Sequence, residues 1–154
     1  MAVIRAASSK DDWVEARRLF EEYAASLGFD LAFQDFDREL ASLPGDYAAP
    51  RGTILLAEDD SGAAGCVALR PFDGETCEMK RLYVRPTHRG TGLGKRLAEA
   101  ILAEARARGY RHMRLDTVPG MESAIALYRS LGFREIAPYR TNPIPGAIFM
   151  EREL

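Results

Sequence analysis

The sequence has few of the residues that build disulfide frameworks or metal centres. Among its 154 residues are two cysteines and two histidines. Neither type recurs at a C-x-x-C or metal-ligand spacing, so we expect no metal site. Cys66 and Cys77 lie in strand-like runs, which favours buried free thiols over a covalent role in catalysis.

The chain also lacks a strong net charge and a long apolar run. Its formal net charge is −2, so no overall field would recruit nucleic acid or an anionic membrane. The N-terminus has no apolar signal core, and no apolar run approaches the length that crosses a bilayer. We therefore expect a cytoplasmic protein without nucleic-acid or membrane partners, folded as a single domain over residues 1–154.

Hydrophobic spacing predicts the order of the elements. Strands are expected over residues 3–5, 53–58, 63–72, 76–84, 112–117, 133–136 and 147–151. Helices are expected from a capping-box-like start at residues 8–12 to residue 28, around residues 36–43, and over residues 92–108 and 121–131. This order, with an antiparallel meander before alternating strands and helices, predicts an α/β domain whose mixed central β-sheet is flanked by helices.

The predicted strand over residues 76–84 ends irregularly. Leu82, Tyr83 and Val84 are all apolar, which breaks the alternation of a strand with one buried face. A β-bulge, or burial on both faces, would explain this run.

A glycine-rich loop follows that strand and opens the next helix. It reads Arg89-Gly90-Thr91-Gly92-Leu93-Gly94, with Lys95 after it. The first N–H groups of a helix have no intrahelical partners and carry partial positive charge, and glycine removes the Cβ atoms that would keep an anion away. The loop is therefore a candidate phosphate cradle.

Two well-known cradles do not match this loop. A P-loop needs Gly where Arg89 stands and Ser or Thr where Arg96 stands. The dinucleotide fingerprint needs a third Gly where Lys95 stands. The pattern that does match is R-x-x-G-x-G after V-x-P, at Arg89, Gly92 and Gly94.

This stretch resembles the coenzyme A pyrophosphate loop of the GNAT superfamily of N-acetyltransferases. A later run, AIALYRSLGF over residues 124–133, resembles the second signature of that family. Both motifs occur in the family order, separated by a helix and a strand, and the resemblance covers about residues 76–136. It implies a GNAT-like fold, acetyl-CoA as cosubstrate and no metal.

The resemblance also implies how the cosubstrate is held. The backbone of residues 82–84 would pair with the amide-rich pantetheine arm like an added strand, and an N–H near Val84 would polarise the thioester carbonyl. The implied cosubstrate-binding residues are Leu82, Tyr83, Val84, Arg89, Gly90, Thr91, Gly92, Leu93, Gly94 and Lys95. Met121 stands where relatives often carry an Asn that contacts pantetheine.

Two residues are catalytic candidates. A carboxylate near a buried cleft can have a raised pKa and act as a base, so Glu78 is the expected base for the acceptor amine, directly or through water. A solvated glutamate, or an ion-pair partner of Lys80 or Arg81, is an equally weighted interpretation. Tyr128, four residues before Gly132, matches the family tyrosine that protonates or hydrogen-bonds the departing thiolate, although core packing is the usual fate of such a tyrosine.

The expected activity is transfer of an acetyl group from acetyl-CoA to a small-molecule or peptide amine, by direct attack in a ternary complex. Arg81 and Arg140 could hold a carboxylate on that acceptor. A non-catalytic acyl-CoA sensor or regulatory module is the alternative, and an enzyme with another acyl donor such as succinyl-CoA is a second. The sequence leaves open whether the protein forms a homodimer and which amine is the acceptor.

Overall fold

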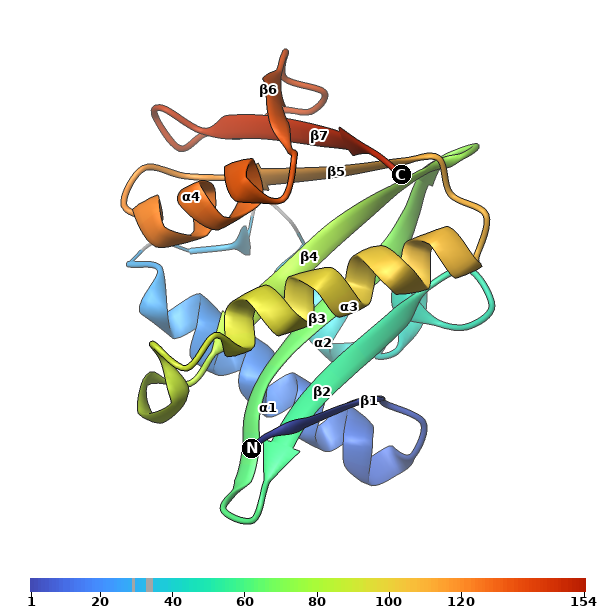
Figure 1. Ribbon diagram of the computed structural model, residues 1–154, viewed down its shortest axis with the longest axis vertical. Coiled ribbons are helices and arrows are strands. Elements are labelled where there is room, and N and C mark those ends of the chain that lie inside the picture. The colour runs from blue at the N-terminus through green and yellow to red at the C-terminus, as the bar shows by residue number, and fades with distance from the viewer. Residues whose placement is uncertain (29, 33–34) are drawn as a thin grey trace.

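A seven-stranded sheet runs through the computed structural model, which describes residues 1–28, 30–32 and 35–154 (Figure 1). The strand order is β1-β2-β3-β4-β5-β7-β6. The strands are β1 (Val3–Ala6), β2 (Thr53–Asp59), β3 (Gly62–Asp73), β4 (Thr76–Val84), β5 (His112–Thr117), β6 (Arg134–Ile136) and β7 (Ile148–Glu153). The β4–β5 pair is parallel and the other neighbours are antiparallel, which confirms the predicted mixed sheet.

Helices cover both faces of this sheet. They are α1 (Lys10–Ser26), α2 (Phe36–Ala41), α3 (Leu93–Ala107) and α4 (Glu122–Ser130), with 3-10 turns η2 (Gly45–Tyr47) and η3 (Pro86–His88). The long helix α3 crosses one face of β3 and β4, and α1 lies behind the sheet on the other (Figure 1). The sheet therefore separates two apolar clusters, one under α3 and one under α1 and α2.

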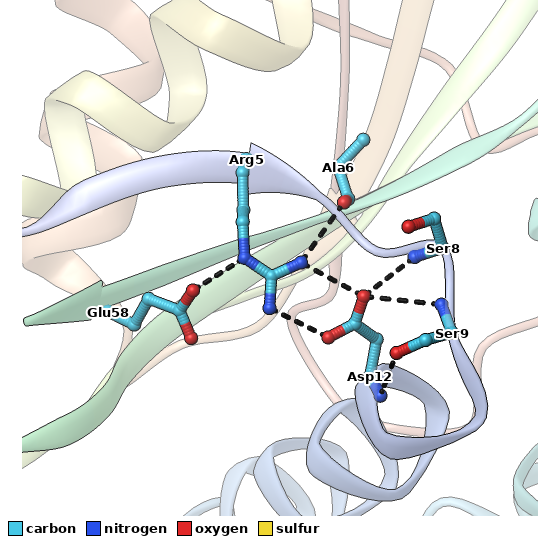
Figure 2. A network of polar contacts seen from close by, with 6 residues as sticks. All are labelled: Arg5, Ala6, Ser8, Ser9, Asp12 and Glu58. Atoms are coloured by element: carbon cyan, nitrogen blue, oxygen red, sulfur yellow. Dashed lines mark hydrogen bonds and ion pairs between the residues drawn. The ribbon is translucent and has the colours of Figure 1, made fainter.

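The start of α1 is tied to the edge of the sheet by a polar network (Figure 2). Ser9 Oγ accepts the N–H of Asp12, and the Asp12 carboxylate accepts the N–H groups of Ser8 and Ser9, so the predicted capping box is present. The Arg5 guanidinium on β1 donates to both Asp12 oxygens, at 2.7 and 2.9 Å, and to Glu58 on β2. One arginine thereby links two strands and a helix.

A β-bulge interrupts β4 near its C-terminal end. Arg81 and Leu82 together face the single residue Val67 on β3, and Arg81 has φ +60. The bulge, one of the two explanations that the apolar run allowed, is present. It bends the strand and changes the direction of the side chains that follow.

Beyond Glu78, β4 and β5 diverge. Their parallel register runs from Thr76↔His112 to Glu78↔Arg114 and stops there. Figure 1 shows the two strands separating toward the end where α4 and the start of α3 lie. The divergence leaves one edge of β4 without a neighbouring strand, and two cavities that Leu82 lines lie along this edge.

Candidate active site

A cleft of about 460 Å³ lies between the free edge of β4 and helix α4. Five of the expected cosubstrate residues line it: Leu82, Tyr83, Val84, Arg89 and Gly94. Met121 lines it as well, and its thioether cannot donate the hydrogen bond that the resemblance implies for an asparagine at this position. Because the wall of this cleft is an unpaired strand edge, an amide-rich ligand can continue the sheet there.

The glycine-rich loop ends the cleft at the start of α3. Gly90 and Gly92 have φ of +78 and +83, a region that favours glycine. Gly92 is the N-cap without a side-chain cap, and the first helical bond joins the Arg96 N–H to its carbonyl. The N–H groups of the first turn are therefore open to an anion, which fits the expected phosphate cradle.

The remaining loop residues contribute in different ways. Leu93 is buried in the core under α3, so only its backbone can face a ligand. The Thr91 hydroxyl donates to the His88 carbonyl at 2.6 Å, and Arg89 Nε donates to the Val84 carbonyl at 3.1 Å. Lys95 is exposed on the first turn of α3. The expected set thus divides into backbone donors, residues that shape the loop and exposed positive charge.

A smaller inner pocket of about 40 Å³ adjoins the cleft in the opening between β4 and β5. The two share the lining residues Tyr23, Leu82 and Met121. Lys80 and Tyr128 also face the inner pocket. Its volume suits a single water molecule or an amine head group.

Tyr128 lies where core and inner pocket meet. Its ring packs edge-on against Phe133 with the centroids 5.8 Å apart, and 8% of the residue is exposed. Burial raises the pKa of Tyr128, and electrostatic interaction with Tyr23 and Asp116 raises it further. The hydroxyl is therefore protonated at neutral pH and can donate a hydrogen bond. Core packing and a position at the site are both observed for this residue.

Glu78 is wholly buried and all of its strong acceptor positions face cations or a hydroxyl. Oε1 accepts a hydrogen bond from Arg70 Nε at 2.9 Å, and Oε2 accepts one from the Tyr139 hydroxyl at 2.9 Å. Arg70 and Arg140 also form ion pairs with Glu78, at 2.9 and 2.6 Å. Burial acts to raise the pKa of Glu78, but the charges of Lys80, Arg70 and Arg140 outweigh it and lower that pKa. The expectation of a raised pKa is wrong, because the cations stabilise the ionised form.

Lys80 is the residue that sequence reasoning missed as a catalytic candidate. It is buried, and its Nζ lies 3.6 Å from Asp116 Oδ1 across the β4–β5 opening. Asp116 also accepts a hydrogen bond from Asn142, at 3.2 Å. Burial lowers the pKa of Lys80 to about 8, although Glu78 and Asp116 partly oppose this. Its position two residues after Glu78, on the same face of a strand, was the available signal.

Arg81 is paired differently from either expectation. Its guanidinium donates to both oxygens of Glu39 on α2, at 2.8 and 2.9 Å, and only 2% of its side chain is exposed. It is therefore neither an ion-pair partner of Glu78 nor open to bind an acceptor carboxylate. The bidentate pair fixes α2 against the bulge of β4.

Both cysteines are buried free thiols, as predicted. Burial raises the pKa of each, that of Cys77 to about 12, so neither is a thiolate at neutral pH. Among the residues that the structure describes, no group of three or more His, Cys, Asp or Glu side chains could hold a metal ion. Over the same residues, no helix is both long and apolar enough to span a membrane.

Comparison with known proteins places this geometry in a family. The model of the Acetyltransferase (GNAT) family matches residues 13–133. A Schizosaccharomyces pombe protein named as an N-acetyltransferase is 43% identical over 98% of this chain and 94% of its own length. A GNAT acetyltransferase from Staphylococcus aureus has the same fold at a TM-score of 0.82, with 19% identity and 99% of each chain covered. A GNAT phosphinothricin acetyltransferase from Sinorhizobium meliloti, solved with acetyl-CoA, gives a TM-score of 0.72 at 23% identity over 99% of this chain and 88% of its own.

The chain therefore belongs to the GNAT family of acetyltransferases. The enzymes of this family are acyl-CoA-dependent N-acetyltransferases, and acetyl-CoA is their cosubstrate in general. The fold and the enzyme class expected from the two motifs are thus confirmed.

Proposed function

We propose that this protein transfers the acetyl group of acetyl-CoA to an amine by direct attack in a ternary complex. The single observation that carries the proposal is the junction of the cleft and the inner pocket at Tyr23, Leu82 and Met121. A cosubstrate lying along β4 would present its reactive end at this junction, within reach of Tyr128 and Lys80. The acetyl thioester supplies an activated acyl group; the chain supplies orientation and proton transfer.

Binding is assigned to three backbone and charge features. The first turn of α3 and the loop at residues 89–95 hold the pyrophosphate, the free edge of residues 82–84 pairs with the pantetheine amides, and an N–H near Val84 donates to the thioester oxygen. The support for this assignment is the cleft that these segments line together. An oxyanion donor of this kind stabilises charge that develops only during attack.

We assign the base to Lys80 rather than Glu78. Glu78 lacks the raised pKa that a base needs, and both of its oxygens already contact arginines, whereas Lys80 faces the inner pocket with a pKa of about 8. A free alkylamine has a pKa of about 10.4, so it arrives as an ammonium ion and must lose a proton before it attacks. Uncharged Lys80 accepts that proton at Nζ, close to the operating pH at which a base is most effective.

Tyr128 completes the reaction on the other side of the junction. When the carbon–sulfur bond breaks, the electron pair stays on sulfur and the second amine proton must reach it. The Tyr128 hydroxyl donates a hydrogen bond to that sulfur and relays the proton. Because a thiol of pKa about 8.5 is already a fair leaving group, the hydroxyl assists departure without being indispensable.

The experiment has a binding arm and a turnover arm. Gly94→Ala introduces a Cβ that would meet only Val84 and Leu127, at ordinary distances of 3.8 and 4.0 Å, so the fold should tolerate it while a phosphate at the loop should not. Calorimetry should show coenzyme A affinity reduced at least tenfold by Gly94→Ala. Acetylation is followed by thiol release with acetyl-CoA and a panel of amines.

A matched glycine pair controls for backbone strain. Gly92 and Gly109 have φ of +83 and +84, and a Cβ at either meets nothing within 4 Å, but only Gly92 lies in the loop. Gly92→Ala should weaken coenzyme A binding and Gly109→Ala should not. Equal affinity in both variants would show that the loop is not the cradle. Tight acetyl-CoA binding without acetylation of any amine would favour the sensor alternative.

A further inference from the structure

A second cleft, of about 490 Å³, lies on the α2 side of the sheet and is separate from the cosubstrate cleft. We call it the polar cleft. It is lined from α2 by Arg38 and Glu39, from η2 by Tyr47, from β3 by Arg70 and from the β6–β7 loop by Arg140. Its walls therefore come from four segments that are distant in sequence.

Two of these arginines share one carboxylate. Arg70 and Arg140 both form ion pairs with Glu78, which is wholly buried behind them, while about a fifth of each arginine side chain is exposed, 20% and 23%. A single carboxylate balances only one guanidinium, and each guanidinium has five N–H donors. A positive charge and unused donors consequently face the polar cleft.

The pair is held rigidly. The Arg140 guanidinium lies over the rings of Phe72 and Tyr139, 5.9 and 5.1 Å from their centroids, and Tyr139 itself donates to Glu78. Arg70 stands on β3 directly opposite Glu78 in the ladder. Donors fixed in this way lose little conformational entropy when an anion binds.

The other charged residues of the cleft do not neutralise the excess positive charge of Arg70 and Arg140. Glu39 is already matched by Arg81, while Arg38 and the acidic residues Asp35 and Asp46 are exposed at the rim, where water screens them. The Tyr47 side chain lines the same cleft, and within the described part of the chain its buried hydroxyl makes no hydrogen bond of good geometry, although the Glu39 carboxylate is near enough to raise its pKa. Buried hydroxyls usually have a well-formed hydrogen bond.

We propose that the polar cleft binds a carboxylate of the acceptor between Arg70 and Arg140, so that the acceptor is an amino acid or another small amine that carries a carboxylate. This inference rests on the proposed function. Glu78, the shared partner of the arginine pair, and Lys80 point to the same face of β4, with their Cα atoms about 7 Å apart along the strand. The arginine pair and the proposed base are therefore neighbours on one face of the sheet, and Glu78 acts as a positioning residue.

The test compares each amino acid of the standard set with its own carboxamide, which keeps the amine and removes the negative charge. Wild-type kcat/KM, measured across a pH range to correct for amine protonation, should be about 10 to 100 times higher for the preferred acid than for its amide. Arg140→Gln should reduce this ratio to near 1 while activity on the amide persists. Arg114→Gln is the matched control, because Arg114 stacks on the same two rings but pairs with Glu151 outside the cleft.

A binding arm keeps this inference separate from the proposed function. Calorimetry with N-acetylated amino acids, the products of the reaction, should detect binding that Arg140→Gln weakens and Arg114→Gln leaves intact, even if no acceptor is turned over. Equal kcat/KM for acids and amides would overturn the inference but leave the acetyltransferase proposal standing. A preference for phosphoethanolamine over every carboxylate, or no product binding across the set, would also overturn it.

Discussion

Two arginine–carboxylate clusters in this protein resemble each other in composition and differ in what surrounds them. The edge cluster joins Arg5 to Asp12 and Glu58 beside α1 (Figure 2). The central cluster joins Arg70 and Arg140 to Glu78, with the Lys80–Asp116 pair beside it. The first has an excess of carboxylates and the second an excess of cations.

The difference lies in how each excess is compensated. In the edge cluster, Asp12 also accepts two backbone N–H groups at a helix start, and the Glu58 side chain is 37% exposed to water. In the central cluster the cations are mostly buried, and they border two cavities. An ion cluster whose excess charge is compensated by backbone groups and solvent contributes to stability. A cluster whose excess charge is not compensated and lies beside a cavity is a candidate for ligand binding and proton transfer.

The substitution with the largest expected effect on the difference between the two clusters is Lys80→Met in the central cluster. Loss of the base should lower kcat/KM by about 10² to 10⁴ with little change in coenzyme A affinity. Wild-type kcat/KM should rise with pH through about 8, because only uncharged Lys80 accepts a proton, and the variant should lose that step. Lys10→Met, which removes an exposed lysine at the start of α1, should match wild type. A variant pH profile that keeps the wild-type step would remove Lys80 from the reaction.

Tyr128→Phe should have the next largest effect. It removes one hydroxyl from the inner pocket and little volume, so kcat should fall by about 10- to 1000-fold while coenzyme A affinity stays constant. Tyr110→Phe is the comparison, since its hydroxyl is also in a mostly buried setting but bonds to the Arg51 carbonyl at the far end of α3. Unchanged steady-state rates in Tyr128→Phe would leave that residue with core packing alone.

Asp12→Asn should affect stability and not turnover. Loss of charge-assisted bonds to Arg5 and the helix start should lower the free energy of unfolding by about 1 to 3 kcal/mol at pH 7. Arg5 and the backbone of Ser8 lower the pKa of Asp12 in the folded state, so this contribution is present above the unfolded pKa of about 3.9 and is lost as pH falls below it. Urea unfolding of both proteins at pH 7 and pH 3 measures it; a difference that did not shrink at pH 3 would contradict this account.

Glu58→Gln should have the smallest effect. Its pair with Arg5 is partly solvated, and such surface pairs contribute about 0 to 1 kcal/mol. Urea unfolding should therefore give nearly the wild-type value, and thiol release should be unaffected. A loss as large as that of Asp12→Asn would mean that the edge cluster depends on all of its members equally.

Much of the fold and part of the site could be predicted from the sequence because the determinants are local. Periodicity located the helices and strands, with bounds that differ from the structure by one or two residues at several ends, and the Ser9–Asp12 capping box depends on residues three apart. The loop at residues 89–94 could be identified for the same reason. Its function depends on adjacent backbone and a helix start.

The sequence by itself therefore determined the architecture and the family and indicated the candidate cradle, while only the tertiary structure distinguished the two charged residues of β4 that we compare as possible bases. The partners of Glu78 come from β3 and from the loop before β7. Asp116, which faces Lys80, comes from β5 and accepts a hydrogen bond from Asn142 of the same loop. The sign of a pKa shift depends on the balance between burial and nearby charges. Glu78 and Lys80 are two residues apart on one face, and the balance of burial and contacts from across the sheet lowers the pKa of both: the shift keeps Glu78 ionised and brings Lys80 to about 8.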